Sequence, residues 1–382
     1  MNEHSAPYEF HLPGVLRVGV GTHTLIPEEA LLLGRRVLVV TDANCARIPE
    51  VAATIASLRE AADAVSVFDA IPGEPTTREV ANGLVAFRAA DAEVVVGLGG
   101  GAVLDTAKAI AIMDQHAGTI GDYAGRDRFT TGRRPLILAP TTAGTGSEAT
   151  RHIAITESAT NVKMLITDWR LLPDVAIVDP LLVAGSPRSV TASSGIDAIT
   201  HGIEAYISRR HQPTADLFAL DGIEQLNRGL QAAWQDGADI SARAATAIGA
   251  LHTGIAFSNS SVALIHGMSR PIGAYFHIPH GLANAMLLPT VTAWSLEGAP
   301  ARYATVARAL GLTDAGDIPG YLARLGDDMK VPRLRDVVPP ERLMAVAEKM
   351  ARDAIESGSP GNNPREASVD DVVRLYDACA RA

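Results

Sequence analysis

The chain has 382 residues, of which 47% are hydrophobic, 20% charged and 4% aromatic, and its formal net charge is −10. This length suggests two domains, and the negative charge argues against a nucleic acid or an anionic membrane surface as a partner. No apolar run approaches the length of a membrane-spanning helix, and the first residues lack the pattern of a secretory signal. Two cysteines, Cys45 and Cys379, do not make a disulfide framework. We therefore expect a cytoplasmic protein without a membrane segment.

The first half of the chain is predicted to alternate between strands and helices. Short apolar runs, rich in valine, predict buried parallel strands at 36–41, 64–68, 93–98, 135–139 and 175–179. Helices are predicted between them at 48–61, at 77–90 with Thr76 or Thr77 as its N-cap, and at 105–113. Ahead of them, 8–12 and 15–19 suggest a hairpin at a sheet edge, which could pair with a second subunit. Repeated β-α-β units at this spacing indicate an open parallel sheet with helices on both faces.

The second half is predicted to be helical. After about residue 188 the strand-like runs nearly vanish, and no repeat, low-complexity segment or long linker interrupts the chain. Long stretches rich in alanine and leucine predict helices at 196–207, 214–230, 241–257, 300–310, 340–354 and 369–380. We thus predict an α/β domain at 1–188 with a parallel sheet, followed by an all-α domain at 189–382.

Two loops of small residues follow predicted strands. The run 97–105, Gly-Leu-Gly-Gly-Gly-Ala-Val-Leu-Asp, ends a strand and opens a helix, an arrangement in which backbone N–H groups can hold a pyrophosphate. It is not the G-x-G-x-x-G fingerprint, because Ala102 occupies the last glycine position. The run 140–148, Pro-Thr-Thr-Ala-Gly-Thr-Gly-Ser-Glu, also follows a strand. Each loop alone could be a tight turn, but two at the carboxyl ends of strands predict a ligand in the crevice of the sheet.

An acidic residue follows the first predicted strand. Asp42 could accept hydrogen bonds from a ribose 2′-OH and would repel a 2′-phosphate, which favours NAD over NADP. Asp42 could equally cap the following helix, and its position alone leaves both interpretations open.

Three histidines and an aspartate in the second half suggest one metal site. Asp197 and His201 are four residues apart, so a helix would place them on one face. His266 and His280 lie farther along, and folding must bring them to the first pair. Three imidazoles and one carboxylate suit Fe(II) or Zn(II) and suit calcium or magnesium poorly. The spacing is also common by chance, so a solvated Asp197 and a histidine packed in the core remain an alternative.

Six segments together resemble the iron-dependent (group III) alcohol dehydrogenase family. They are 99–108, 140–150, 195–204, the His266 segment, 278–284 and 363–365. They run in order from about residue 12 to the C-terminus, so the resemblance covers essentially the whole chain. It implies a dehydroquinate-synthase-like architecture, in which a nucleotide-binding α/β domain and a helical metal-binding domain enclose a metal in their cleft. It also implies a homodimer or a larger homo-oligomer.

The resemblance also implies site residues, carried over position by position. The metal ligands, and through the metal the catalytic residues, would be Asp197, His201, His266 and His280, with Fe²⁺ or Zn²⁺ as the ion. The family pattern would place NAD on Asp42, Gly99, Gly100, Gly101, Asp105, Thr141, Thr142, Thr145, Ser147, Lys163 and Leu182.

Two positions depart from the family pattern. Ala102 stands where serine is usual, which removes one hydroxyl near the phosphates. Arg270 stands where many members have a second histidine that lines the substrate and nicotinamide pocket, and an arginine cannot act as a general base. His277 is either an alternative catalytic histidine or a surface residue. Arg151 and His152 lie where the family approaches nicotinamide and substrate, so they join Arg270 as candidate substrate-binding residues.

The resemblance implies a metal-dependent NAD(H) alcohol dehydrogenase or aldehyde reductase that acts on a short primary alcohol, diol or aldehyde. In such an enzyme the ion stabilises the alkoxide and the nicotinamide takes the hydride. Arg270 could bind an anionic group of a hydroxy acid or semialdehyde, or it could form a salt bridge or contact the cofactor pyrophosphate. The alternatives are a lyase like dehydroquinate synthase, an enzyme like glycerol dehydrogenase, and a non-catalytic NAD-binding regulator.

Overall fold

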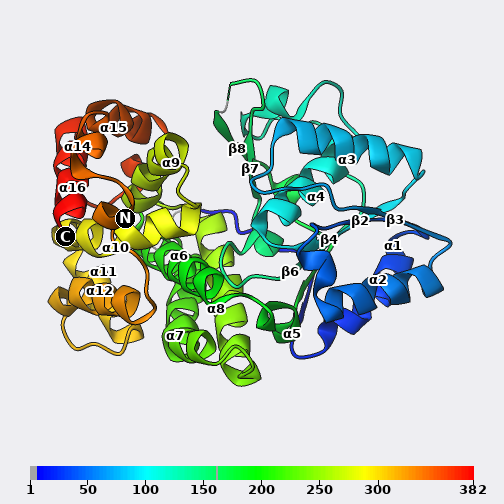
Figure 1. Ribbon diagram of the computed structural model, residues 1–382, viewed down its shortest axis with the longest axis horizontal. Coiled ribbons are helices and arrows are strands. Elements are labelled where there is room, and N and C mark those ends of the chain that lie inside the picture. Colours follow the sequence, from blue (N-terminus) through cyan, green and yellow to red (C-terminus); the bar gives the residue numbers. More distant parts are fainter. Residues whose placement is uncertain (1–6, 161) are drawn as a thin grey trace. The chain divides into compact units, whose positions relative to one another are not determined.

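The computed structural model describes residues 7–160 and 162–382. They form two compact units: His11–Ser186, which we call the α/β unit, and Pro187–Ala382 together with the described residues up to Phe10, which we call the helical unit. The chain passes from one unit to the other after Ser186, whereas the sequence placed this boundary after residue 188. All named strands lie in the α/β unit, and all named elements from Pro187 onward are helices, which confirms the predicted fold class (Figure 1).

Six parallel strands form the main sheet of the α/β unit. Their order across the sheet is β1 (Val15–Val18), β9 (Val175–Val178), β6 (Leu136–Pro140), β4 (Val94–Gly99), β2 (Arg36–Val40) and β3 (Ala64–Phe68). Every residue of β4 and of β6 is buried, because helices cover both faces of the sheet. This burial explains why the strands appear in the sequence as continuous apolar runs without polar alternation.

Helices pack on both faces of this sheet, as the predicted β-α-β units require (Figure 1). On one face Leu58 packs in the same apolar cluster as Val39. On the other face Leu104 packs in the same cluster as Leu38. Neighbouring residues of one strand thus serve opposite faces. The helices are α1 (Ile26–Leu33), α2 (Pro49–Ala61), α3 (Thr77–Ala89), α4 (Gly101–Met113) and α5 (Pro180–Ala184).

The α/β unit also contains a smaller sheet that we did not predict. Its strands, in order, are β5 (Gly125–Arg126), β8 (Lys163–Thr167) and β7 (His152–Thr156), and β7 and β8 are antiparallel. β7 alternates between buried and half-buried residues, so it offers no continuous apolar run. The sequence pattern is correspondingly weak over these strands.

The predicted N-terminal hairpin is wrong. Residues 7–13 belong to no strand, and β1 pairs in parallel with β9. The hydroxyl groups of Tyr8 and Thr214 are 2.7 Å apart, and the rings of Phe10 and Phe218 stack with their centroids 5.9 Å apart. The segment therefore packs on a helix some 200 residues later in the chain, a contact that a local sequence pattern does not contain.

The helical unit begins with three long helices, α6 (Arg188–Ile207), α7 (Pro213–Gln235) and α8 (Ile240–Asn259). The predicted helix at 340–354 is instead two helices. Four other helices were not predicted, and two of these contain an internal proline, Pro271 or Pro289. The remaining helices are α9 (Leu264–Phe276), α10 (His280–Ser295), α11 (Pro300–Ala309), α12 (Ile318–Asp328), α13 (Leu334–Val337), α14 (Pro340–Met344), α15 (Ala347–Glu356) and α16 (Val369–Arg381). Within the described ranges no single helix is long and apolar enough to cross a membrane; only α8 and α9 together meet that test, with a bend of 101° between them.

Candidate functional site

One helix, α6, carries the first two proposed metal ligands. Asp197 and His201 lie one turn apart, and Nε2 of His201 is 3.9 Å from Oδ1 of Asp197. Both side chains are buried, and Phe257 of α8 stacks on the His201 ring with its centroid 4.2 Å away. Asp197 is only 2% exposed, so it is not the solvated residue that chance spacing would produce.

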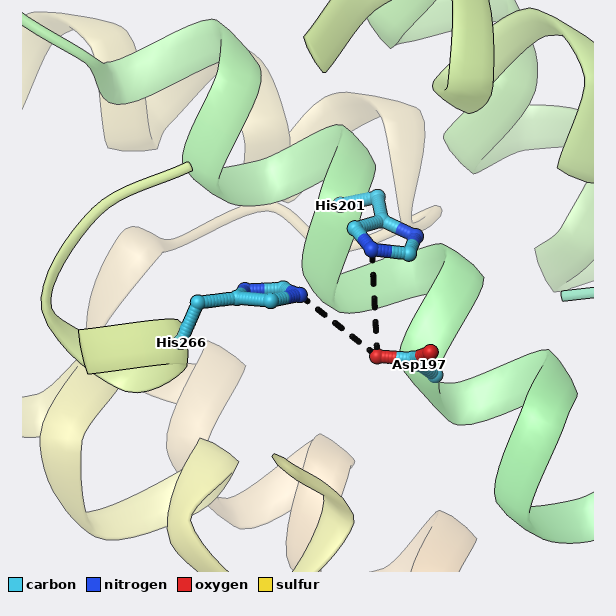
Figure 2. A group of neighbouring side chains, drawn as sticks. All are labelled: Asp197, His201 and His266. Atoms are coloured by element: carbon cyan, nitrogen blue, oxygen red, sulfur yellow. Dashed lines mark ion pairs between the residues drawn. The ribbon is translucent and has the colours of Figure 1, made fainter. Parts of the chain in front are cut away.

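The third histidine comes from α9. Nε2 of His266 lies 3.6 Å from Oδ1 of Asp197, and its ring stacks on that of His201 with the centroids 4.7 Å apart. Figure 2 shows that the side chains of Asp197, His201 and His266 point toward one another. Each offers one possible ligand atom, and these three atoms lie within 4.8 Å of one another. Tertiary structure thus gathers residues that are up to 69 positions apart in the sequence.

His280 reaches the same centre through Asn284. His280 begins α10, and Asn284 lies one turn later on the same helix. Nδ2 of Asn284 lies 2.6 Å from Oδ1 of Asp197. It also lies 3.1 Å from Nε2 of His266 and 3.2 Å from Nε2 of His280. Atoms of three of the four proposed ligands therefore face a single point, which a side-chain amide approaches.

This donor set fits a divalent cation. An amide nitrogen carries two hydrogens, so Asn284 cannot donate a full hydrogen bond to all three acceptors around it. Oδ1 of Asn284 is buried and has no hydrogen-bond partner among the described residues. A divalent ion at this point would bind the carboxylate oxygen and the imidazole nitrogens that Asn284 cannot all satisfy. These ligand types suit Fe²⁺ or Zn²⁺.

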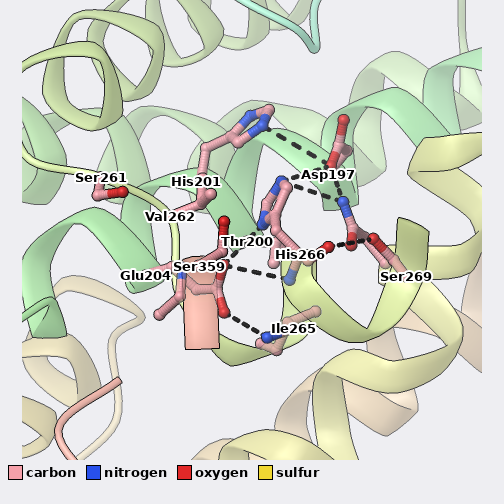
Figure 3. A network of polar contacts seen from close by, with 12 residues as sticks. Asp197, Thr200, His201, Glu204, Ser261, Val262, Ile265, His266, Ser269 and Ser359 are labelled. Carbon is pink, nitrogen blue, oxygen red and sulfur yellow. Dashed lines mark hydrogen bonds and ion pairs between the residues drawn. The ribbon is translucent and has the colours of Figure 1, made fainter. Parts of the chain in front are cut away.

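Glu204 of α6 fixes the orientation of His266 (Figure 3). Its carboxylate accepts a hydrogen bond from Nδ1 of His266 at 2.7 Å. It also accepts the backbone N–H groups of Ala263 at 2.8 Å and Ile265 at 2.6 Å, where α9 begins. Because Nδ1 holds the proton, Nε2 is left as the acceptor that faces Asp197.

From the sequence we had assigned no role to Glu204, although this residue ends the segment 195–204 that resembles the family. Its distance of seven residues from Asp197 and three from His201 places all three side chains on one helix face. That spacing was the available signal, and it became informative only once His266 was known to lie opposite.

Opposing effects set the charges at this centre. Burial by itself would raise the pKa of Asp197, but the imidazoles of His201, His266 and His280 hold the pKa of this carboxyl well below its ordinary value. Burial would lower the pKa of His266, whereas Asp197 and Glu204 raise it overall. Asp197 is therefore held in the ionised form, which is the form that binds a metal.

In the α/β unit, three adjacent strands bring the proposed cofactor residues to one edge of the sheet. β2, β4 and β6 are neighbours, and they lead directly into Asp42, Gly100 and Thr141. The loops after β4 and β6 approach closely, because a Cβ on Gly101 would lie only 2.7 Å from Cγ2 of Thr145. This edge, at the carboxyl ends of parallel strands, is where such sheets bind ligands.

Several proposed cofactor residues hold these loops together. Thr141 donates its N–H to the carbonyl of Gly99 at 3.0 Å, and a Cβ on Gly100 would lie 3.6 Å from Cγ2 of Thr142. The Ser147 hydroxyl donates to Oδ1 of Asp105 at 2.6 Å. The glycine loop and the threonine loop are therefore one connected structure.

The other proposed cofactor residues are placed differently. Oδ1 of Asp42 accepts the N–H groups of Asn44 at 2.8 Å and Cys45 at 2.9 Å, so it is bonded to the backbone of the turn that follows β2. It does not cap the next α-helix, α2, whose N-cap is Ile48. Lys163 of β8 lies 2.7 Å from the carboxylate of Glu74. Leu182 of α5 is fully buried in the apolar cluster beneath the sheet.

Two buried charged residues that we had assigned no role, Lys108 and Glu148, lie near the threonine loop 140–148. The Lys108 ammonium donates to the carbonyl of Thr150 at 2.9 Å and to that of His152 at 3.0 Å. Burial lowers the pKa of Lys108 to about 8. Burial raises the pKa of Glu148 to about 7. Lys108 thereby joins α4 to the segment that contains Arg151 and His152, and Nδ1 of His152 lies 2.8 Å from the Thr167 hydroxyl.

Arg270 and His277 follow His266 on α9. Arg270 lies one turn after His266, and its Nη1 donates to the hydroxyl of Ser359 at 2.9 Å. His277 ends the helix with a φ of +56°, and its side chain is exposed. The structure therefore holds Arg270 within the fold, whereas His277 occupies a surface position.

The chain is similar to characterised dehydrogenases over its full length. Residues 13–180 match the family model of the iron-containing alcohol dehydrogenases, and residues 191–380 match the C-terminal model of the same family. The chain is 35% identical to the 1,3-propanediol dehydrogenase of Citrobacter freundii over 381 residues, which span 97% of this chain and 98% of that protein. These matches confirm the resemblance that the motifs suggested.

Solved structures agree with this result. The crystal structure of a 1,3-propanediol oxidoreductase superposes with a TM-score of 0.94 at 34% identity, covering 98% of this chain and 100% of that one. A sulfoacetaldehyde reductase from Bifidobacterium kashiwanohense, solved in complex with NAD+, superposes with a TM-score of 0.89 at 28% identity and covers 98% and 99% of the two chains.

Proposed function

Since the chain belongs to the iron-containing alcohol dehydrogenase family, we propose that it is a metal-dependent NAD(H) dehydrogenase that interconverts a short primary alcohol or diol with its aldehyde. Oxidoreductase chemistry on a CH–OH group follows from the family. The observation that carries the proposal is the convergence of Asp197, His266 and His280 on one buried point beside His201.

We assign metal binding to Asp197, His201, His266 and His280, with Fe²⁺ or Zn²⁺ as the ion. When bound, such an ion supplies a Lewis acid for the substrate oxygen. Asp197 contributes the one negative charge of the ligand set. Glu204 keeps the proton of His266 on Nδ1, which presents Nε2 to the ion.

We assign NAD binding to the edge of the sheet formed by the loops after β2, β4 and β6. When bound, NAD supplies the hydride acceptor. The glycine loop opens α4, and no side chain caps this helix, so its first backbone N–H groups can bind a pyrophosphate. Asp42 follows β2, where an acidic residue can bind a ribose. A structural relative was also solved with NAD+. In the helical unit we assign substrate binding to Arg270, and from the family resemblance alone we also propose Arg151 and His152 of the α/β unit as substrate-binding residues.

We further propose a homodimer in the cytoplasm. β1 is an edge strand of the sheet, and its residues Val15 and Val18 are 38% and 41% exposed, as a strand that pairs with a second copy requires. Cys45 and Cys379 are both free thiols, which suits a reducing compartment. Light scattering of the purified protein tests the dimer, and a monomer would contradict it.

The function is tested by metal analysis of protein purified without oxygen, together with NADH oxidation on a panel of short aldehydes. The panel includes anionic aldehydes, because one structural relative is a sulfoacetaldehyde reductase. We expect about one iron or zinc ion per chain and aldehyde-dependent oxidation of NADH. Bound metal and NAD without NADH consumption would contradict the proposal and favour a lyase or a regulator.

A further inference from the structure

Arg270 lies on the same face of α9 as the metal ligand His266. The two residues are four positions apart, which corresponds to an advance of about 6 Å along a helix. The 3₁₀ turn η8 (Ser359–Asn362) covers this face closely, because a Cβ on Gly267 would lie 2.5 Å from Pro360. The partner of Arg270, Ser359, belongs to that turn. Arg270 is therefore held one helix turn from a proposed metal ligand, in a half-buried position.

The guanidinium of Arg270 has no acidic partner among the residues that the structure describes. Its Nη1 donates to the neutral Ser359 hydroxyl, and across residues 7–160 and 162–382 no carboxylate oxygen lies within 4.0 Å of its nitrogens. The negative charge of Glu204 favours the charged form of Arg270. That carboxylate, however, is already bonded to His266 and to the backbone at the start of α9. Burial lowers the pKa of Arg270, yet an arginine stays charged in a protein.

Other half-buried arginines of the chain are paired differently. Arg133, Arg170 and Arg302 lie 2.6 to 3.1 Å from a carboxylate oxygen of Asp174, Asp168 and Asp216, respectively. A buried cation without a counter-charge is unfavourable, and an arriving anion relieves that penalty. A guanidinium has five N–H donors in a planar fork. Within the described part of the chain Arg270 makes only the bond from Nη1 to Ser359, so it can still bind an oxyanion with two parallel hydrogen bonds.

We propose that Arg270 binds an anionic group at the far end of the substrate, so that the preferred substrate is a short aldehyde or alcohol bearing a carboxylate, sulfonate or phosphate. The inference rests on the proposed function, since it takes the carbonyl end to lie at the metal centre. Ser359 orients the guanidinium and leaves its remaining donors to the oxyanion. Arg270 is thus a specificity residue and not a general base.

The test compares matched charged and neutral aldehydes. Catalytic efficiency, kcat/KM, is measured for 4-oxobutanoate and for its methyl ester, which has the same chain without the charge. We expect Arg270→Gln to reduce the preference for the acid by about 10- to 100-fold, because a charge-assisted hydrogen bond is lost. Arg270→Lys keeps the charge without the fork and should retain part of the preference. The same ratio for sulfoacetaldehyde against propanal shows whether a sulfonate is bound better than a carboxylate.

Arg243 of α8 is the matched control. It is an arginine more deeply buried than Arg270, and it donates to the Thr191 hydroxyl at 2.9 Å and to the carbonyl of Gly237 at 3.1 Å. Arg243→Gln should leave the ratio of efficiencies unchanged, whatever it does to thermal stability. Thermal unfolding of each variant identifies a change that merely disrupts folding.

Calorimetric binding of 4-hydroxybutanoate, without nicotinamide, gives a readout that does not depend on turnover. We expect its Kd to rise in Arg270→Gln by a factor similar to the loss of preference. If neither the ratio of kcat/KM for acid and ester nor this Kd changed, the inference would be overturned. An effect confined to the KM for NADH would also overturn it and would assign Arg270 to the cofactor. If the wild-type protein reduces no aldehyde at all, the proposed function has failed, and calorimetry still decides whether Arg270 binds the anion.

Discussion

At the scale of single residues, Glu204 shows how one carboxylate can serve both fold and chemistry. It accepts the first backbone N–H groups of α9, which have no partner within the helix. It also holds Nδ1 of His266. The start of α9 and the orientation of the proposed metal ligand that follows it therefore depend on the same side chain.

We predict that Glu204→Gln weakens metal binding by about 10- to 100-fold, the usual effect of losing such a support. A glutamine has the same size, but its amide presents only one acceptor oxygen and no charge. Competition with a chelator measures the affinity, and the ¹⁵N chemical shifts of His266 report which ring nitrogen holds the proton. The exposed Glu224 of α7 provides the control Glu224→Gln. Unchanged affinity with an unchanged tautomer would show that Glu204 only caps the helix.

Glu148 provides a prediction on pH. Its pKa in the folded protein is about 7, above the ordinary value of 4.5. Between these pH values the folded protein keeps a proton that the unfolded chain has released, so the free energy of unfolding falls as pH rises. The fall attributable to Glu148 is about 3 kcal/mol over this window.

A glutamine at this position does not titrate. Glu148→Gln should therefore gain about 3 kcal/mol relative to the wild type between pH 4.5 and 7. Urea denaturation of both proteins across this range measures the difference. Two parallel stability curves would mean that Glu148 is ionised throughout and that burial does not raise its pKa.

At the scale of elements, glycines set the close approach of α7 and α8. A Cβ on Gly222 of α7 would lie 2.6 Å from Cγ2 of Thr253 and 3.0 Å from the carbonyl oxygen of Gly249, both on α8. α8 also carries Phe257, which stacks on His201. The distance between these two helices therefore influences the position of a metal ligand.

We predict that Gly222→Ala lowers the free energy of unfolding by about 1 to 3 kcal/mol, because the added methyl group overpacks the interface. Gly326 of α12 is the control, since its nearest neighbour would be 3.9 Å from a Cβ. Gly326→Ala should instead add about 0.5 to 1 kcal/mol, because alanine favours a helix. Urea denaturation measures both, and equal effects would contradict the packing argument.

At the scale of the whole molecule, the proposed metal site joins three helices. α6, α9 and α10 each supply at least one proposed ligand, so an ion would connect segments from Asp197 to His280. An ion that binds only the folded state stabilises it in proportion to the logarithm of its concentration.

Removal of the metal should therefore lower the Tm. At a free ion concentration of about 100 times Kd the stabilisation is about 2.7 kcal/mol, which corresponds to about 5 to 10 °C for a unit of this size. Scanning calorimetry with and without a chelator measures the shift. In His266→Ala, which lacks one ligand, the shift should shrink, and an equal shift in both proteins would place the ion elsewhere.

Local patterns predicted those features that depend on neighbouring residues. The valine runs marked the main parallel strands, because burial on both faces leaves an apolar stretch that is visible in any window. The glycine and threonine loops were visible as small residues directly after strands. The spacing of Asp197 and His201 was sufficient for that pair, because four residues complete one turn of a helix.

Tertiary structure decided what depends on distant contacts. Tyr8 and Phe10 contact a helix some 200 residues later instead of joining a hairpin. β7 and β8 were missed because neither contains a continuous buried run. The family resemblance predicted His266 and His280 as ligands. Only the packing of α9 and α10 against α6 showed how these residues approach Asp197, how Glu204 bonds to His266 and where Asn284 lies. The sequence by itself thus determined the elements and the chemical groups available, because these follow from local periodicity and residue type. Only the tertiary structure determined which groups meet, because that depends on how loops return the chain upon itself.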